Sequence, residues 1–86
     1  MTREFSNKVA LVTGGSRGIG RSISIALGQS DARVAVNYLS DAVAARSTLA
    51  DIEKKGGTGD IFQADVSNES AVIKMIEEIE SSLGPI

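Results

Sequence analysis

A glycine-rich run, TGGSRGIG at residues 13–20, is the feature that most constrains how this chain folds. The apolar run VALV at residues 9–12 precedes it, and a run of helical composition follows at residues 22–27. Glycine adopts backbone angles that other residues resist, and it lets the backbone approach a ligand closely. The first turn of a helix offers unpaired N–H groups and a positive dipole end to a phosphate. The sequence therefore predicts a strand–turn–helix unit that binds the diphosphate of a dinucleotide.

Apolar runs and amphipathic runs alternate along the rest of the chain. We expect strands at residues 8–13, 33–37 and 59–66. We expect a first helix at residues 18–30. A second helix should run from a cap at Ser40 or Asp41 to about residue 55, and a third from a cap at Ser67 or Asn68 to Gly84-Pro85. Strands separated by helices pair in parallel through right-handed crossovers. The predicted fold is α/β: the N-terminal half of a doubly wound parallel sheet, βαβαβα, with strand order 3-2-1.

Each predicted helix carries an apolar stripe that we expect to face the sheet. The stripes consist of Ile23, Ala26 and Leu27 in the first helix, of Ala42, Ala45, Leu49 and Ile52 in the second, and of Val72, Ile76, Ile79 and Leu83 in the third. The first strand is apolar throughout, which is typical of a strand covered on both faces. In a doubly wound sheet the ligand lies between the first strand and a fourth strand on its other side. We therefore expect residues 1–86 to be a cofactor-binding half whose catalytic half is absent.

Composition excludes several kinds of site. The 86 residues include no cysteine and no histidine, which removes disulfides, thiol chemistry, histidine bases and the usual zinc ligands. The net charge is −2, and no basic cluster marks a nucleic-acid surface. No apolar stretch reaches membrane-spanning length, and the N-terminus is polar. We expect no metal site, no nucleic-acid or membrane partner, and a cytoplasmic location.

The glycine run has two rival interpretations. It could be an ordinary strand-to-helix turn without a ligand. Residues 15–22 also read G-x-x-x-x-G-R-S, which resembles a phosphate-binding P-loop with Arg21 in place of the lysine. The spacing of Thr13, Gly14, Gly18 and Gly20 after a strand and before a helix favours the dinucleotide turn.

The end of the second strand bears on the choice of cofactor. NAD-binding proteins commonly carry an acidic residue about twenty residues past the glycines, where it binds the ribose 2′-hydroxyl. Here Asn37 and Tyr38 occupy that region, so no carboxylate repels the 2′-phosphate of NADP. Arg17 in the glycine run is placed to meet that phosphate. The sequence favours NADP(H) over NAD(H).

The end of the third strand, Asp65-Val66, allows two roles. The carboxylate of Asp65 could accept a hydrogen bond from an adenine amino group, with Val66 lining the ring. Alternatively, Asp65 could serve the N-terminus of the third helix, where acidic residues are favourable. Both roles fit the position.

With these segments in view, the whole chain resembles the short-chain dehydrogenase/reductase family, and within it the 3-oxoacyl-[acyl-carrier-protein] reductases. The resemblance implies a Rossmann fold, an NADP(H) cofactor and reduction of a 3-oxoacyl thioester in fatty acid biosynthesis, with acyl carrier protein as a partner and a homo-oligomer when complete. It implies that the diphosphate and 2′-phosphate are lined by Gly14, Ser16, Arg17, Gly18, Ile19 and Gly20. It places Asn37 and Tyr38 at the adenosine ribose, and Asp65 and Val66 at the adenine.

The chain also departs from that family. The family's catalytic serine and its Asn-Asn-Ala-Gly segment are absent. The Tyr-x-x-x-Lys pair is absent too, because the only tyrosine is Tyr38 and Ala42 stands at the lysine spacing. We therefore name no catalytic residue and expect the 86 residues alone to be inactive. Asp31 stands where the family tends to have glycine, with a mild cost to stability. The alternatives are a non-catalytic nucleotide-binding or regulatory module, another short-chain reductase, and a structural piece that completes its sheet against a partner.

Overall fold

The computed structural model describes residues 6–14 and 18–86, in which three strands and three helices alternate. They are β1 (Val9–Val12), α1 (Gly18–Gln29), β2 (Arg33–Tyr38), α2 (Ala42–Lys54), β3 (Thr58–Gln63) and α3 (Glu69–Ser82). The predicted order of elements is confirmed. The largest difference in bounds is at β3, which ends at Gln63, whereas the sequence pattern suggested a strand reaching residue 66.

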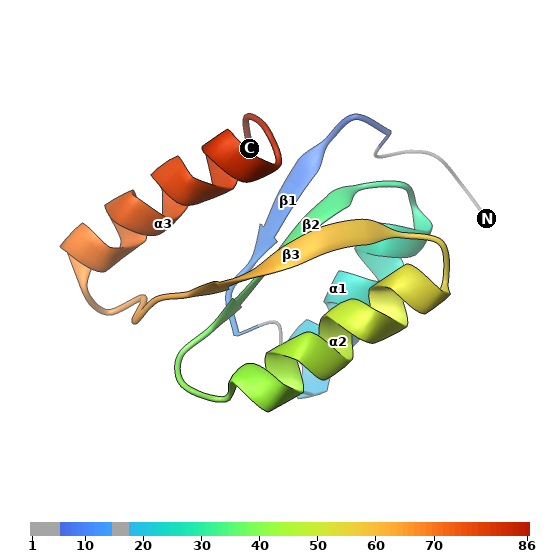
Figure 1. Cartoon of the computed structure of the whole chain (residues 1–86), viewed down its shortest axis with the longest axis horizontal. Helices are drawn as coiled ribbons and strands as arrows, with labels where there is room; N and C mark the ends of the chain where they lie inside the picture. The colour runs from blue at the N-terminus through green and yellow to red at the C-terminus, as the bar shows by residue number, and fades with distance from the viewer. Residues whose placement is uncertain (1–5, 15–17) are drawn as a thin grey trace.

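The three strands form one parallel sheet with β2 in the middle (Figure 1). The order β1-β2-β3 has the same neighbours as the expected 3-2-1 order, read from the other edge. Val12 pairs with Val36, and Tyr38 pairs with Gln63, so all three strands end at the same edge of the sheet. Within the described residues, β1 pairs with β2 alone.

Helices cover both faces of this sheet. α3 lies on one face, and α1 and α2 lie on the other (Figure 1). Successive strand residues point to opposite faces. Two buried clusters result: Val9, Ala35, Ala64, Met75 and Ile79 on the α3 face, and Val12, Ala32, Val34, Val36 and Ile52 on the α1–α2 face. Full burial of side chains such as Ile52 and Ile79 stabilises the fold by roughly 1.5–3 kcal/mol each.

Side-chain caps begin two of the helices and settle choices that the sequence left open. The Asp41 carboxylate accepts a hydrogen bond from Ala44 N at 2.9 Å and caps α2. The Asn68 amide oxygen accepts one from Ala71 N at 3.1 Å and caps α3. Such caps contribute about 1 kcal/mol each by satisfying N–H groups that have no partner within the helix.

The predicted buried stripe of α1 is wrong for two of its three residues. Ile23 is 47% exposed and Ala26 is exposed, whereas Leu27 packs at the margin of the core. The fully buried positions are the small residues Ser24 and Gly28. A Cβ added to Gly28 would lie 2.8 Å from Ile52 Cγ2 of α2, so α1 turns its narrow face inward because only small residues fit there.

The predicted stripe of α3 is rotated relative to the observed one. Ile79 is fully buried and Leu83 packs against the core, as expected. Met75 is buried as well, whereas Val72 and Ile76 are only half-buried. The apolar residues of α3 cover more of its circumference than one contact can bury, so packing against the sheet selects among them.

Candidate functional site

The glycine-rich turn leaves β1 through backbone angles that favour glycine. Gly14 has φ +63° and Gly18, the first residue of α1, has φ +54°. Both are exposed, and a Cβ added at either would meet no atom within 4 Å. Left-handed angles strain residues with a side chain, so glycine is required here by backbone geometry and not by crowding. Ser16 and Arg17, which the sequence places at the phosphates, lie outside the described residues.

The first turn of α1 suits an anion. It contains no acidic residue, so no carboxylate neutralises the positive end of the helix dipole. Ile19 in this turn is 81% exposed and Gly20 is half-buried. The backbone N–H groups at this end have no partner within the helix, which is the donor set that a phosphate requires.

The carboxyl ends of the strands bring the other predicted residues to the same edge. Asn37 lies near the end of β2, and its side chain contacts both the glycine turn and the residues that follow β3. Its Oδ1 accepts a hydrogen bond from Gly14 N at 3.2 Å, and its Nδ2 donates to Ala64 O at 3.2 Å. Asp65 follows Ala64 directly. One side chain therefore links the glycine turn to the residue that precedes Asp65.

The Asn37 side chain itself is buried, with 3% of its surface exposed. Its Nδ2 also lies 3.3 Å from Phe62 O and 3.4 Å from Met75 Sδ, so it points toward α3. Tyr38, the next residue, points to the opposite face of the sheet, where α1 and α2 lie, and is half-buried. The two residues that the sequence placed together beside a ribose thus face in opposite directions.

Asp65 holds the turn between β3 and α3. Its Oδ1 accepts hydrogen bonds from Ser67 Oγ at 2.6 Å and from Ser67 N at 2.9 Å. The Ser67 hydroxyl first, and its backbone N–H second, lower the pKa of Asp65 from the ordinary 3.8, against a small opposing effect of burial. Asp65 is therefore ionised at neutral pH. The cap of α3 is Asn68, so Asp65 supports the turn before the helix and not the helix end.

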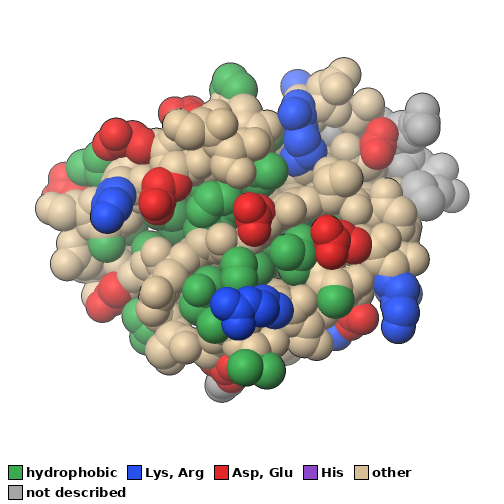
Figure 2. All heavy atoms as spheres, in the orientation of Figure 1, with side chains coloured by type: hydrophobic (Ala, Val, Ile, Leu, Met, Phe, Trp, Pro, Cys, Tyr) green, Lys and Arg blue, Asp and Glu red, His purple; other side chains and the backbone are tan. Residues whose placement is uncertain are grey.

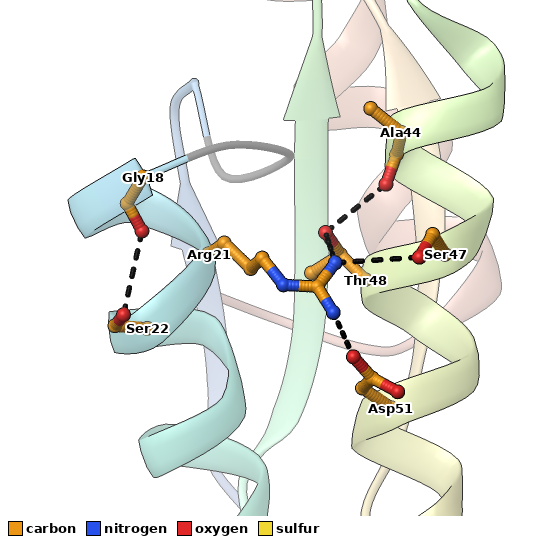
Figure 3. Close-up of polar contacts among 7 residues, drawn as sticks. All are labelled: Gly18, Arg21, Ser22, Ala44, Ser47, Thr48 and Asp51. Carbon is orange, nitrogen blue, oxygen red and sulfur yellow. Dashed lines mark hydrogen bonds and ion pairs between the residues drawn. The ribbon is translucent and has the colours of Figure 1, made fainter.

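Arg21 is directed away from the glycine turn (Figure 3). Its guanidinium forms an ion pair with Asp51 of α2 and donates to Thr48 Oγ1 at 3.0 Å and to Ser47 Oγ at 3.5 Å. In a P-loop the residue at this position would bind phosphate, so the P-loop interpretation is not supported by the position of Arg21. Its charge ties α1 to α2 instead.

A cleft of about 550 Å³ lies elsewhere, between β3 and α3. Figure 2 shows hydrophobic side chains gathered in the middle of this face, between α3 and α2. The cleft is lined by Ile61, Phe62, Gln63, Ala71, Lys74 and Glu78. None of these residues belongs to the glycine turn, so this cleft is separate from the predicted dinucleotide site.

Two other classes of site find no support within residues 6–14 and 18–86. No group of three or more His, Cys, Asp or Glu side chains is arranged to hold a metal ion. In the same part of the chain, no helix is long and apolar enough to cross a membrane.

The family model for short chain dehydrogenases matches residues 8–86, which is nearly the whole chain. This chain belongs to the short-chain dehydrogenase family. The matched range includes the glycine turn, the end of β2 and the Asp65 turn.

Several characterised and uncharacterised relatives are similar to this chain. Versicolorin reductase stcU of Emericella nidulans is 43% identical over 80 residues, which cover 93% of this chain and 30% of that protein. The 3-oxoacyl-[acyl-carrier-protein] reductase FabG of Staphylococcus epidermidis is 42% identical over 80 residues, 93% of this chain and 33% of FabG. The homolog YusS of Bacillus subtilis is 45% identical over 80 residues, 93% of this chain and 73% of YusS.

Solved structures agree with the fold. A dehydrogenase/reductase from Sinorhizobium meliloti has a TM-score of 0.89 and 38% identity, over 92% of this chain and 31% of that one. A metagenomic short-chain oxidoreductase in complex with NADP has a TM-score of 0.86 and 32% identity, over 93% and 36%. With the exception of YusS, this chain spans only about a third of the length of each of these proteins.

Sequence reasoning missed two features of this site. One is the inward role of Asn37, for which the signal was a polar residue within the buried run of β2. The other is the ion pair between Arg21 and Asp51, for which no signal exists, because the residues lie thirty positions apart on helices whose packing the pattern did not predict.

Proposed function

We propose that this chain forms the NADP(H)-binding part of a short-chain dehydrogenase/reductase. The observation that carries the proposal is the junction of β1 and α1, where Gly14 and Gly18 take left-handed angles at the sheet edge that also holds Tyr38 and Asp65. A similar structure is a complex with NADP, which supports the same cofactor. When bound, NADPH supplies a hydride for the reduction of a carbonyl group.

In this proposal the glycine turn and the start of α1 hold the phosphates. The helix end contributes N–H donors and a positive dipole, with no acidic residue to oppose an anion. Open space beside both left-handed glycines allows close approach of the diphosphate. The residues assigned to this part of the site are Gly14, Ser16, Arg17, Gly18, Ile19 and Gly20.

The adenosine part of the site falls to the ends of β2 and β3. Because the Asn37 side chain is buried and bonded to protein groups, we assign the ribose contact to Tyr38, whose side chain lies on the opposite face of the sheet. Asp65 and Val66 are exposed beside it and are assigned to the adenine. Both hydrogen bonds from Ser67 use Oδ1 of Asp65, so Oδ2 takes part in neither and can accept from the adenine amino group.

The preference for NADP(H) follows from charge. Neither Asn37 nor Tyr38 brings a carboxylate to the ribose, and Arg17 supplies a cation for the 2′-phosphate. A charge-assisted hydrogen bond of this kind contributes roughly 1.5–3 kcal/mol, which corresponds to tenfold or more in affinity. The test is calorimetric titration of the wild-type chain and of Arg17→Ala with NADPH and with NADH.

Arg17→Ala is expected to weaken NADPH binding at least about tenfold and to leave NADH binding nearly unchanged. The matched control is Arg33→Ala. Arg33 is an exposed arginine at the start of β2, so it lies at the amino ends of the strands and away from the carboxyl ends that form the site. Equal weakening of both cofactors by Arg17→Ala would contradict the assignment. Absence of NADPH binding by the wild-type chain would contradict the proposed function as a whole.

For the complete protein we propose reduction of a 3-oxoacyl thioester on acyl carrier protein, as in fatty acid biosynthesis, by a cytoplasmic homo-oligomer. The likeness to FabG supports this substrate class. Relatives named for versicolorin, for tetrahydroxynaphthalene and for 1-cyclohexenylcarbonyl-CoA are about as similar, so another short-chain reductase is the alternative. An assay of the complete protein against 3-oxoacyl thioesters and against versicolorin- and tetrahydroxynaphthalene-type substrates separates the two.

The 86 residues by themselves are proposed to be inactive. No residue of the sequence matches the Tyr-x-x-x-Lys pair that the family resemblance assigns to proton donation. The free edge of β1, with only β2 as neighbour in the described chain, marks where the remaining strands would continue the sheet. Oxidation of NADPH by the purified chain in the presence of a 3-oxoacyl thioester would refute this statement.

A second candidate is a nucleotide-binding module without catalysis. One observation favours it: YusS, a homolog that shares 45% identity, is itself matched over 73% of its length. This function requires that the chain binds NADPH. It also requires that the intact mass of the protein isolated from cells equals that of the short chain. A longer cellular protein that carries a Tyr-x-x-x-Lys pair favours the reductase.

A further inference from the structure

A buried asparagine interrupts the apolar run of β2. Val34, Ala35 and Val36 are fully buried, and Asn37 continues the run with 3% of its surface exposed. A buried amide without partners costs several kcal/mol, and the cost is removed only when its hydrogen-bonding groups are satisfied. Asn37 is therefore present in the core for the contacts that its two ends make.

The contacts fix which way the amide points. Two backbone carbonyls, Phe62 O and Ala64 O, lie 3.3 and 3.2 Å from the same end of the side chain, and carbonyls accept only from N–H groups. That end must be Nδ2, and Met75 Sδ at 3.4 Å suits a donor as well. The oxygen Oδ1 is thereby turned toward Gly14, whose N–H lies 3.2 Å away.

The bond to Gly14 is not needed to satisfy Gly14. This residue is exposed, so water could accept from its N–H at little cost in free energy. A buried acceptor differs from water because it is fixed in place by bonds to β3 and α3. The bond therefore sets the direction in which the chain leaves β1 and supports the left-handed φ of +63° at Gly14.

We propose that Asn37 is a positioning residue that holds the start of the glycine turn in its nucleotide-binding geometry. It acts through the N–H of Gly14 and does not contact the nucleotide. The same amide ties the turn to Ala64, the residue before Asp65, so the diphosphate and adenine ends of the site are held by one side chain. The expected effect on nucleotide binding rests on the proposed function, whereas the hydrogen bond to Gly14 does not depend on it.

The first test requires no variant and no ligand. NMR scalar coupling across the hydrogen bond, between the Gly14 amide nitrogen and the Asn37 side-chain carbonyl carbon, is expected to be detectable in the wild-type chain. The Gly14 amide is expected to exchange with solvent about tenfold or more slowly than an unbonded glycine amide. Absence of the coupling together with unprotected exchange at Gly14 would overturn the inference, whether or not the chain binds NADPH.

The second test uses two variants of similar shape. Asn37→Leu removes both ends of the amide, and Asn37→Asp keeps the acceptor for Gly14 while it removes the donors. We expect Gly14 exchange to quicken about tenfold in Asn37→Leu and to stay slow in Asn37→Asp. We expect NADPH to bind Asn37→Leu about fivefold or more weakly than the wild type. Asn37→Asp is compared with the wild type by Gly14 exchange alone, because its carboxylate would also repel the 2′-phosphate.

A matched control is Thr48→Val, which removes a fully buried hydroxyl of α2 that is bonded to Arg21 and to Ala44 O. It is expected to lower stability without changing Gly14 exchange or NADPH affinity. If Asn37→Leu binds NADPH as the wild type does, or if Thr48→Val weakens binding equally, Asn37 has no positioning role. Should both Asn37 variants fail to fold, the coupling and exchange of the wild type decide. Failure of the wild type to bind NADPH refutes the proposed function and leaves the Gly14 measurements to decide on Asn37.

Discussion

Arg21 of α1 forms an ion pair with Asp51 of α2, and its guanidinium also donates to Thr48 (Figure 3). The side chains of the pair are 31% and 34% exposed, so solvent screens part of their attraction. We expect Asp51→Asn to lower the free energy of unfolding by about 0.5–1 kcal/mol, with NADPH affinity unchanged. Urea denaturation measures the first quantity and calorimetry the second.

A double-mutant cycle with Arg21→Gln isolates the pair. The cycle is expected to give a coupling free energy of about 0.5 kcal/mol between Arg21 and Asp51. If Arg21→Gln weakened NADPH binding without changing stability, the guanidinium would belong to the phosphate site after all, as in the P-loop interpretation.

Asp31 ends α1 in the left-handed conformation that Gly56 adopts at the end of α2. Their φ values are +72° and +87°, and each end is closed by the same bond, from Ala32 N to Leu27 O and from Gly57 N to Ile52 O. This is the geometry in which glycine is preferred. Asp31→Gly is therefore expected to raise the free energy of unfolding by about 0.5–1 kcal/mol.

Gly56→Ala is the matched reverse change. A Cβ at Gly56 meets no atom within 4 Å, so the substitution adds backbone strain without a clash and is expected to cost about 1 kcal/mol. Thermal unfolding of both variants gives the comparison. A loss of stability in Asp31→Gly would show that the aspartate side chain contributes more than its backbone angle costs.

Features that depend on local sequence were predicted well, and features that depend on packing were not. The second helix was expected to end at about residue 55, and α2 ends at Lys54, followed by Gly56 in the left-handed conformation. Asp31, which stands where the family tends to have glycine, is left-handed as well. The face of α1 was predicted from hydrophobicity and is wrong at Ile23, because the interface with α2 selects small residues. Local sequence patterns predict the backbone conformation of a segment, but they do not predict how closely two helices approach.

The candidate site also has features that depend on local sequence and features that depend on packing. The glycine turn was recognised because it is a short segment with its own residue signature. The turn at Asp65 was not, because the third strand was expected to reach residue 66, whereas β3 ends at Gln63. The bond between Asn37 and Gly14 spans 23 positions and depends on which face of β2 the side chain occupies. Strand alternation predicts that face only once the position of α3 is known.

Asp65 provides a prediction about pH. The Ser67 hydroxyl is the largest cause of its lowered pKa, and the Ser67 N–H is the second. Ser67→Ala removes the first and keeps the second, so the pKa of Asp65 is expected to rise toward, but not to, the ordinary value of 3.8. Carboxyl carbon NMR during acid titrations of the wild type and of Ser67→Ala measures it directly.

The sign of the effect on stability follows from the lowered pKa. A carboxyl group whose pKa is lower in the folded state stabilises the fold above its unfolded pKa, and this contribution is lost as the pH falls through the folded pKa. Ser67→Ala is therefore expected to reduce stability at neutral pH and to match the wild type more closely in acid. An unchanged Asp65 titration in Ser67→Ala would contradict the assigned cause.

Gly28 tests how closely α1 and α2 approach. Glycine-to-alanine changes within a helix ordinarily stabilise by about 1 kcal/mol, because alanine has the higher helix propensity. At Gly28 the added Cβ would lie 2.8 Å from Ile52 Cγ2, and overpacking of this kind costs about 1–3 kcal/mol. We expect Gly28→Ala to lower the free energy of unfolding by about 1–2 kcal/mol in urea denaturation.

The control is the same change in an Ile52→Leu background, which lacks the Cγ2 methyl group. There Gly28→Ala is expected to be neutral or stabilising, so the two substitutions should show a coupling of about 1–2 kcal/mol. Ile52→Leu alone has its own packing cost, which the double-mutant cycle removes. A stabilising Gly28→Ala in the wild-type background would mean that the helices separate readily, and that the small face of α1 is not what sets their spacing.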